Sequence, residues 1–269
     1  MSAIFNSRAA KSAGVCSHYA FVLLLFLASA RGLAQDNENT NETAFARAVR
    51  LLEEARSQAL AEPRNSELAW QHSRACFDAG EFAPNDTRKA EFALQGIDAA
   101  RKSLSLDPDL APGHYYLGMN LGQLARTKKL GALKLVDEME SSFFAVVRLN
   151  PRFDFAGAPR CLGLLYRDAP GWPISVGNRS KAREHLSKAV ELSPEYPDNW
   201  LCLIEAYLTW GERERARRHL QAFQEHLQAA RKRFTGIVWK TSWESWDERL
   251  KAIQSKLQAE KLESPKATK

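Results

Sequence analysis

Glycine and proline are scarce in this chain of 269 residues, which contains 14 glycines and 11 prolines. A β-rich domain needs many tight turns, and these two residues build most of them. Good helix formers dominate instead, chiefly alanine, leucine, glutamate, lysine, glutamine and arginine. The composition therefore argues against a strand-based fold and predicts an all-α one. A hydrophobic content of 45% is sufficient for a sizeable core.

The common motifs of catalysis and metal binding are also missing. The sequence has no His-Glu-x2-His zinc motif, no Cys-x2-Cys pair, no Gly-x4-Gly-Lys-Ser/Thr phosphate loop and no Gly-x-Ser-x-Gly elbow. His219 and His226 have a spacing that suits one helix face, but no third ligand has convincing spacing. We therefore predict a non-enzymatic protein that uses no metal or cofactor.

The chain has little net charge outside its N-terminus. The formal charge is +6, and residues 1–34 supply three of these positive charges and no acid, which leaves +3 for the rest. Acidic and basic residues are mixed along the remaining sequence, as on solvated helix faces. The sequence therefore gives no reason to expect a nucleic-acid partner.

Cysteine is rare, with four copies. Cys76, Cys161 and Cys202 lie beyond the N-terminal segment, and an odd number does not complete a disulfide framework. Each lies in an apolar helical stretch, so buried free thiols are the first expectation. A Cys161–Cys202 disulfide is the alternative if the compartment is oxidising.

No apolar run near the N-terminus is long enough to span a bilayer, but one has the length of a signal-peptide core. Residues 20–30 read AFVLLLFLASA, follow Arg8 and Lys11, and precede small residues as far as Ala34. We predict a signal peptide over 1–34, cleavage near Ala34, and a soluble protein exported to the periplasm. An uncleaved anchor is the alternative. Cys16 precedes the run, so no lipoprotein cysteine follows it.

A repeated helical pattern occupies residues 65–235. The clearest copy contains Leu162-Gly163-x2-Tyr166, followed by a second helix and a closing Pro194. This is the tetratricopeptide (TPR) grammar, in which large residues fill the groove between helices A and B and a proline ends the unit. Three further copies occur, at Trp200–Phe223, at His114–Pro151 and, most weakly, at Trp70–Pro108. The sequence predicts about four cryptic TPR-like repeats.

Two of these repeats are longer than usual. Pro108, Pro151 and Pro194 close successive units and are spaced 43 residues apart, whereas an ordinary TPR unit has about 34 residues. The extra residues fall between helix A and helix B, and only the last unit has a short turn, at 209–212. Loops are where repeat proteins often carry function, so the insertions are candidates for a binding role.

The organisation expected around the repeats is simple. Residues 35–64 form an N-terminal segment with a first helix, 236–262 form a C-terminal capping helix, and 263–269 form a disordered tail. Trp239, Trp243 and Trp246 have helical spacing and are predicted to cover the last repeat, or alternatively to form an exposed docking face. Helices are expected at 42–61, 66–79, 87–106, 112–126, 131–149, 158–168, 179–192, 197–210, 212–232 and 241–262.

The third unit carries a more specific resemblance. It combines Leu162-Gly163-x2-Tyr166, the stretch Ala169-Pro-Gly-Trp-Pro173, a short glycine loop ending at Gly177, and Lys181-Ala-x2-His-Leu186. This combination resembles the T component of tripartite ATP-independent periplasmic (TRAP) transporters, the TatT family. The resemblance is strongest over 155–210 and looser over about 65–235.

The resemblance implies a periplasmic all-α protein built from cryptic TPR units. It also implies a TRAP solute-binding protein as partner, a homotrimer, and a hydrophobic channel that could pass a small hydrophobic ligand. The function expected on this basis is that of a non-enzymatic accessory protein of a TRAP-type uptake system. The alternative is a general exported TPR scaffold that mediates protein–protein interaction. The chain departs from the family in lacking a lipoprotein cysteine after the apolar run, which puts membrane tethering in doubt.

Four residues of the third unit are candidates for binding a ligand or partner. Trp172 and Pro173 lie in a proline- and glycine-rich stretch that cannot be a continuous helix. Trp172 either anchors an apolar ligand or partner, or fills a gap between repeats. Arg160 either binds a carboxylate-bearing ligand, or is solvated or paired within the protein. Tyr166 occupies a repeat position that suits the core, with ligand contact as the alternative.

Overall fold

The structure, a computed structural model, describes residues 43–128 and 131–263. Within these ranges it contains α-helices, two short 3₁₀ helices and no named strand. The predicted signal peptide and tail residues 264–269 lie outside them. Among the described helices, none combines the length and hydrophobicity needed to cross a membrane. The α-helices are α2 (Ala44–Ala61), α3 (Ser66–Glu81), α4 (Asp86–Leu106), α5 (Ala111–Thr127), α6 (Val136–Leu149), α7 (Phe153–Asp168), α8 (Arg179–Leu192), α9 (Pro197–Thr209), α10 (Arg213–Arg233) and α11 (Lys240–Glu263).

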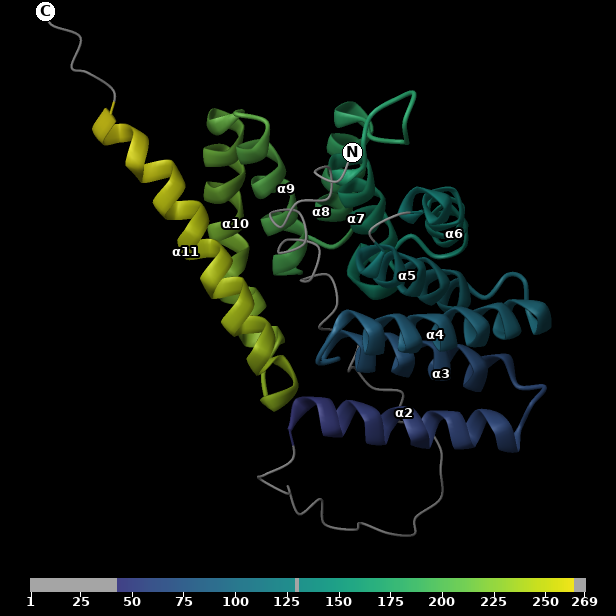
Figure 1. The fold of residues 1–269 in the computed structure, drawn as a ribbon. Helices are drawn as coiled ribbons and strands as arrows, with labels where there is room; N and C mark the ends of the chain where they lie inside the picture. Colours follow the sequence, from purple (N-terminus) through teal and green to yellow (C-terminus); the bar gives the residue numbers. More distant parts are fainter. Residues whose placement is uncertain (1–42, 129–130, 264–269) are drawn as a thin grey trace, which may run out of the picture.

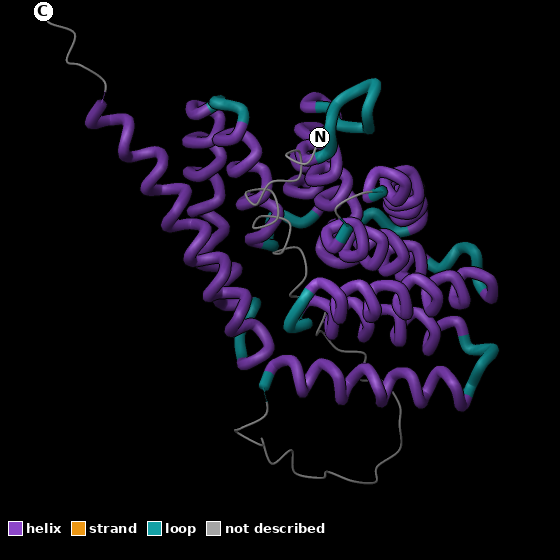
Figure 2. The backbone as a smooth tube through the Cα atoms, viewed as in Figure 1, coloured by secondary structure: helices purple, strands orange, loops and turns teal. Residues whose placement is uncertain are grey.

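The helices form an array of antiparallel pairs (Figures 1 and 2). The pairs are α3–α4, α5–α6, α7–α8 and α9–α10, and each pair packs on the next. Helix α2 packs on α3 at one end, and α11 packs on α9 at the other. The axes turn along the array: α2 to α5 run across the view of Figure 1, whereas α7 to α10 run up it. The prediction of an all-α, TPR-like array with four repeats is confirmed.

The predicted insertions lie between the two helices of the middle pairs. Residues 128–135 separate α5 from α6 and include the 3₁₀ helix η1 (Ala132–Leu135), and residues 169–178 separate α7 from α8. The turn between α9 and α10 is short, as expected. The second insertion is a loop that projects beyond the end of α7 (Figures 1 and 2). Helices α4, α6 and α8 all end two residues before a proline.

Glycine allows the helices of the third pair to approach closely. A Cβ atom at Gly163 of α7 would lie 2.5 Å from Cγ of Leu186 and 3.0 Å from its backbone nitrogen. Leu186 belongs to α8 and is fully buried. Gly118 of α5 has the same role against the ring of Phe143 in α6. The repeat glycines therefore set the distance between helix A and helix B.

The C-terminal tryptophans form a cap over the last repeat. Trp239 and Trp246 are buried and Trp243 is half-buried. They pack with Phe234 and Tyr196, and the Trp243 indole donates a hydrogen bond to the carbonyl of Phe234 (2.7 Å). The structure thus supports the packing interpretation of these residues and not an exposed docking face.

The start of α7 differs from the expected boundary at 158. Helical hydrogen bonding begins at Phe153, but Asp154, Phe155 and Ala156 have left-handed backbone angles, with φ of 50°, 52° and 61°. The right-handed helix starts after them, which leaves Pro159 in its first turn, where a missing N–H costs little. The sequence pattern could not predict this turn because left-handed residues are usually glycine or asparagine.

We expect Gly163→Ala to destabilise the protein by about 1–3 kcal/mol, because the new methyl group overlaps Leu186, including its backbone. Urea unfolding of the two proteins measures the difference. Gly122→Ala is the matched control, since its methyl group would meet only the flexible end of Met139, at 3.2 Å. An equal cost for both substitutions would contradict the packing argument.

Candidate binding site

The first helices of the pairs, α3, α5, α7 and α9, form one wall of the array, which we call the A-helix face. Three features lie on this face or at its edge. The first is a buried chain of charged side chains, the second is an apolar pocket between α5 and α7, and the third is the projecting loop 169–178. All four sequence candidates belong to the first or third feature, or to the core beneath them.

Arg160 is the centre of the charged chain. Its side chain is 0% exposed. Its Nη1 donates to Oδ1 of Asn199 (2.7 Å), its Nε lies 3.2 Å from Oδ2 of Asp198, and its Nη2 lies 3.4 Å from Oδ2 of Asp154. The guanidinium also lies over the ring of Tyr196, at 5.1 Å. Arg160 is therefore paired within the protein, and the alternative that it binds a ligand carboxylate does not fit its burial.

The left-handed turn at 154–156 is held by this cluster. Asp154 accepts a hydrogen bond from the hydroxyl of Tyr115 (2.5 Å). The carbonyl of Phe155 accepts from Asn199 (3.0 Å) and Arg160 (3.3 Å), and the Phe155 ring stacks on Tyr196 with centroids 4.6 Å apart. Backbone in this region costs about 1–3 kcal/mol per residue and persists only where the surroundings fix it. Here the surroundings come from α5, α7 and α9.

The charged chain continues to the C-terminal helix. Asp198 accepts a hydrogen bond from Arg249 of α11, and Arg249 also makes two hydrogen bonds of 2.7 Å to Glu205. Burial alone would lower the pKa of Arg249, but Glu205 and Asp198 outweigh it and raise that pKa well above its usual value. The chain Asp154–Arg160–Asp198–Arg249–Glu205 therefore joins α7, α9 and α11.

At the Asp154 end of this chain, burial of the carboxyl outweighs the stabilisation of its charge by neighbouring groups. Burial raises the pKa of Asp154 to about 6, against the opposing effects of Arg160 and the Tyr115 hydroxyl. Because the folded protein binds this proton more tightly than the unfolded chain, Asp154 favours folding less as the pH rises from about 4 to about 6. The arrangement fixes the start of α7 against α9.

An apolar pocket of about 150 Å³ lies between α5, α6 and α7. Phe77, Met119, Met139, Leu164 and Leu165 are among its lining residues, with Arg126 and Asp168 as the two charged ones. Helices α5 and α7 contact each other much less than α3 and α5 do, so the pocket occupies the gap between them.

The pocket residues were not among the sequence candidates. No local pattern in the sequence marks them. Only the packing of α5, α6 and α7 shows that a cavity results.

The loop 169–178 presents Trp172 to solvent. Its side chain is 90% exposed and that of Ile174 is 58% exposed. Pro173 follows Trp172 through a cis peptide bond. The loop base is closed by hydrogen bonds from Gly177 N to Pro170 O and from Asn178 N to Tyr166 O, both 2.8 Å. Trp172 therefore fills no gap between repeats, and the gap-filling alternative is wrong.

Glycine is required where this loop closes. A Cβ atom at Gly177 would lie 2.1 Å from the carbonyl oxygen of Ala169 and 2.7 Å from the backbone of Pro170. These neighbours are backbone atoms and cannot move aside easily. The two ends of the loop are thus held together directly, and the tip carries its two apolar side chains on a constrained backbone.

Tyr166 lies in the core below this loop. It is buried, its hydroxyl donates a hydrogen bond to Glu140, and its ring stacks on His185 with centroids 5.5 Å apart. Lys181 lies over the same ring, at 4.9 Å. The core interpretation of Tyr166 therefore fits the structure, and the ligand-contact alternative does not.

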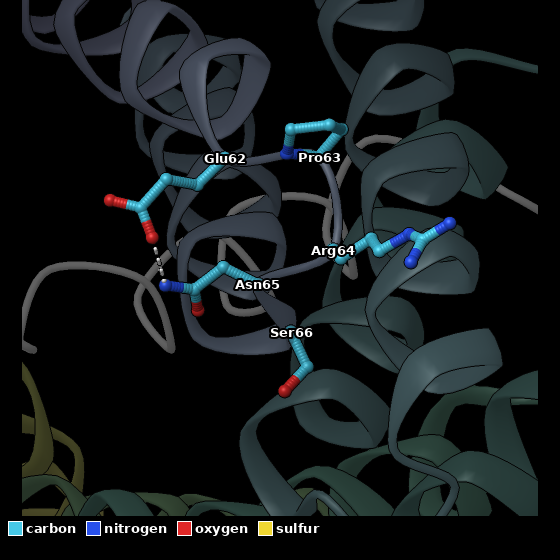
Figure 3. Close-up of a pocket in the computed structure, with 5 residues that line it drawn as sticks. All are labelled: Glu62, Pro63, Arg64, Asn65 and Ser66. Atoms are coloured by element: carbon cyan, nitrogen blue, oxygen red, sulfur yellow. Dashed lines mark hydrogen bonds between the residues drawn. The ribbon is translucent and has the colours of Figure 1, made fainter.

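A second hollow, at the turn between α2 and α3, is open and has few features of a binding site. Figure 3 shows its five lining residues, Glu62 to Ser66, around an open surface depression of about 580 Å³. Glu62 accepts a hydrogen bond from Asn65 (2.9 Å). Its residues are exposed or half-buried, and Asn65 already serves as the N-cap of α3. We do not treat it as a binding site.

The described cysteines are free thiols. Cys76, Cys161 and Cys202 are all buried and unbridged, so the alternative Cys161–Cys202 disulfide is not formed. Cys161 contacts the sulfur of Met119 at 3.6 Å, beside the apolar pocket. Within 43–128 and 131–263, no group of three side chains is placed to hold a metal ion.

We expect Arg160→Met to destabilise the protein by about 3–5 kcal/mol, because it removes the positive charge that lies between the buried carboxylates of Asp154 and Asp198. Chemical denaturation measures this loss. The control is Arg88→Met, which breaks an exposed pair with Glu91 and should cost at most about 1 kcal/mol. A similarly small loss for Arg160→Met would show that the cluster does not hold the fold.

Comparisons with known proteins agree with this architecture. The family described as "Regulator of microtubule dynamics protein 1-3" matches residues 26–132, which is less than half of the chain and excludes the third repeat. No curated protein matches the sequence. The solved structure of TTC0263, a TPR protein of Thermus thermophilus, matches with a TM-score of 0.57 and 18% identity, over 79% of this chain and 93% of that one.

A structure of MamA protein also matches, at a TM-score of 0.48 and 17% identity, over 72% of this chain and 97% of that one. At such identities a structural likeness shows the fold alone. The TRAP-family resemblance finds no support among these matches, whereas the repeat architecture does. The chain is an all-α, TPR-like helical repeat protein.

Proposed function

We propose that the protein is a non-enzymatic scaffold that binds a partner protein at the edge formed by loop 169–178. The observation that carries the proposal is the exposure of Trp172 on a constrained loop. Tryptophan is enriched among the residues that contribute most to protein–protein binding, and exposed apolar side chains that lie together, as Trp172 and Ile174 do on this loop, are typical of an interaction site. The TPR-like architecture supplies the rigid support on which such a loop is presented.

The loop is already organised for binding. Hydrogen bonds at its base, and a further one from Ile174 N to Gly171 O (3.0 Å), hold the backbone around Trp172. A side chain on a preorganised backbone loses less conformational entropy on association than one on a flexible segment. Trp172 and Ile174 together present an apolar tip that a partner can cover.

We expect the double substitution Trp172→Ala and Ile174→Ala to abolish capture of at least one protein that the unaltered chain captures from an extract of its own host. The loss should be at least about tenfold, which is the usual scale for a hot-spot tryptophan. Quantitative mass spectrometry of affinity-captured proteins measures it. Circular dichroism should show unchanged helical content, because neither side chain packs in the core.

The matched control is Leu60→Ala, which removes another exposed apolar side chain, 70% exposed, at the far end of the array on α2. This variant should capture the same proteins as the unaltered chain. If the loop variant and the unaltered chain capture the same proteins in the same amounts, the proposed role of the loop is wrong.

A second candidate is the more specific role of an exported accessory protein in a TRAP-type uptake system. The resemblance of residues 155–210 to the TatT family supports it, as does the apolar pocket, which suits a small apolar ligand. In this case the partner would be a TRAP solute-binding protein, the first 34 residues would direct export to the periplasm, and the protein could assemble as a homotrimer.

We expect, on this second candidate, that the protein recovered from the host begins near Gln35 and binds a purified TRAP solute-binding protein of the same host. Intact-mass measurement and light scattering of the mixture test the two points. An uncleaved N-terminus, or no complex with any TRAP solute-binding protein of the host, would leave only the general scaffold.

A further inference from the structure

We infer that the pocket between α5, α6 and α7 receives one uncharged apolar side chain of the partner, of about the size of a benzene ring. The inference rests on the proposed scaffold function and names the chemistry by which the partner is recognised. Three observations lead to it: the size and lining of the pocket, the pairing of the two charged residues that line it, and its position at the base of loop 169–178.

The volume and lining set the size and polarity of the occupant. An engineered cavity of about 150 Å³ with aliphatic and aromatic walls stays dry and binds benzene, and this pocket has the same volume of about 150 Å³. Apart from Arg126 and Asp168, its lining is apolar, with the rings of Phe77 and Phe143 and the methyl ends of Met119 and Met139 among the contributors. Methionine walls adapt to the shape of an aromatic or branched aliphatic group.

The pocket exists because small residues stand where larger ones would fill the space. Gly122 and Ala125 are the small residues of α5 on this wall, beside Met119. A Cβ atom at Gly122 would have only the flexible end of Met139 within 4 Å, at 3.2 Å. Ala125 also lines the pocket, so a larger side chain at this position would extend into the cavity.

The two charged residues that line the pocket are each paired within the protein. Arg126 makes an ion pair of 2.6 Å with Glu81, and Asp168 makes one of 2.6 Å with Arg167. A charged ligand group would lose its hydration on entering the apolar interior and would find both lining charges already paired. The pocket therefore selects an uncharged group.

The position of the pocket indicates that its occupant belongs to the protein partner. Ala169 lines the pocket and is also the first residue of the loop that carries Trp172. A partner that covers Trp172 would thus lie beside the pocket. In such an arrangement Trp172 packs against the partner, and one apolar side chain of the partner enters the pocket.

The methionines allow a direct test of the pocket in the unaltered chain. The sequence has three, Met1, Met119 and Met139, and the last two line the pocket. With ¹³C-methyl methionine labels, toluene should shift the signals of Met119 and Met139 in a saturable manner by ring-current effects. Benzoate and benzylamine, which are charged groups of similar size, should leave both signals unchanged at the same concentrations. The absence of toluene-dependent shifts, or equal shifts with the charged compounds, would overturn the inference.

A second measurement links the pocket to the partner. Ala125→Phe should remove the toluene response and lower capture of the Trp172-dependent protein by about tenfold, whereas Ala229→Phe, at an exposed position on α10, should leave both unchanged. Saturating toluene should compete with that protein for the unaltered chain, which keeps the test valid if Ala125→Phe does not fold. Capture that resists both toluene and Ala125→Phe would overturn the side-chain anchor and leave the scaffold function standing. If the Trp172→Ala and Ile174→Ala variant captures the same proteins as the unaltered chain while toluene still shifts the methionine signals, the scaffold function is contradicted and the toluene site stands.

Discussion

The guanidinium of Arg160 is a positive charge that the protein has to neutralise in its interior. It does so with Asp154, Asp198 and Asn199, which come from the start of α7 and from α9. Because a buried charge without partners is far more costly than an exposed one, these contacts fix the relative position of two repeats. Asp198 also accepts a hydrogen bond from Arg249, so the capping helix α11 belongs to the same network. The left-handed turn at 154–156 is the local conformation that this network requires.

The insertions in the second and third repeats determine where the proposed binding surface for a partner protein lies. Ordinary TPR pairs are joined by short turns, and their first helices can pack side by side along the array. Here α3 and α5 pack closely, whereas α5 and α7 separate, and the apolar pocket occupies the space between them. The longer connection from α7 to α8 forms a loop that carries Trp172 into solvent. The pocket and the loop that carries the exposed Trp172 thus share one residue, Ala169, at the base of the loop.

The A-helix face has two parts with different roles: the charged chain, and an apolar edge that consists of the pocket and loop 169–178. The chain is internally paired and mostly buried, with Glu205 and Arg249 partly exposed at its end, and it holds the repeats in register. The edge holds the apolar surface that a partner can cover, and the ion pairs Arg126–Glu81 and Arg167–Asp168 beside the pocket are already satisfied. On the proposed function, the partner is recognised by shape and hydrophobic contact, because both charged residues that line the pocket are already paired.

The sequence by itself determined the helices and their grouping. The A- and B-helix signatures, the prolines spaced 43 residues apart and the helical spacing of Trp239, Trp243 and Trp246 are local patterns, and local hydrogen bonding and packing decide them. Only the tertiary structure decided the state of the candidate residues. Arg160 and Tyr166 are buried while Trp172 is exposed, although all three lie in one short stretch, because burial depends on contacts with residues tens of positions away, such as Asp198 and Glu140. The pocket has the same origin, since three separate helices enclose it and no single segment encodes its volume.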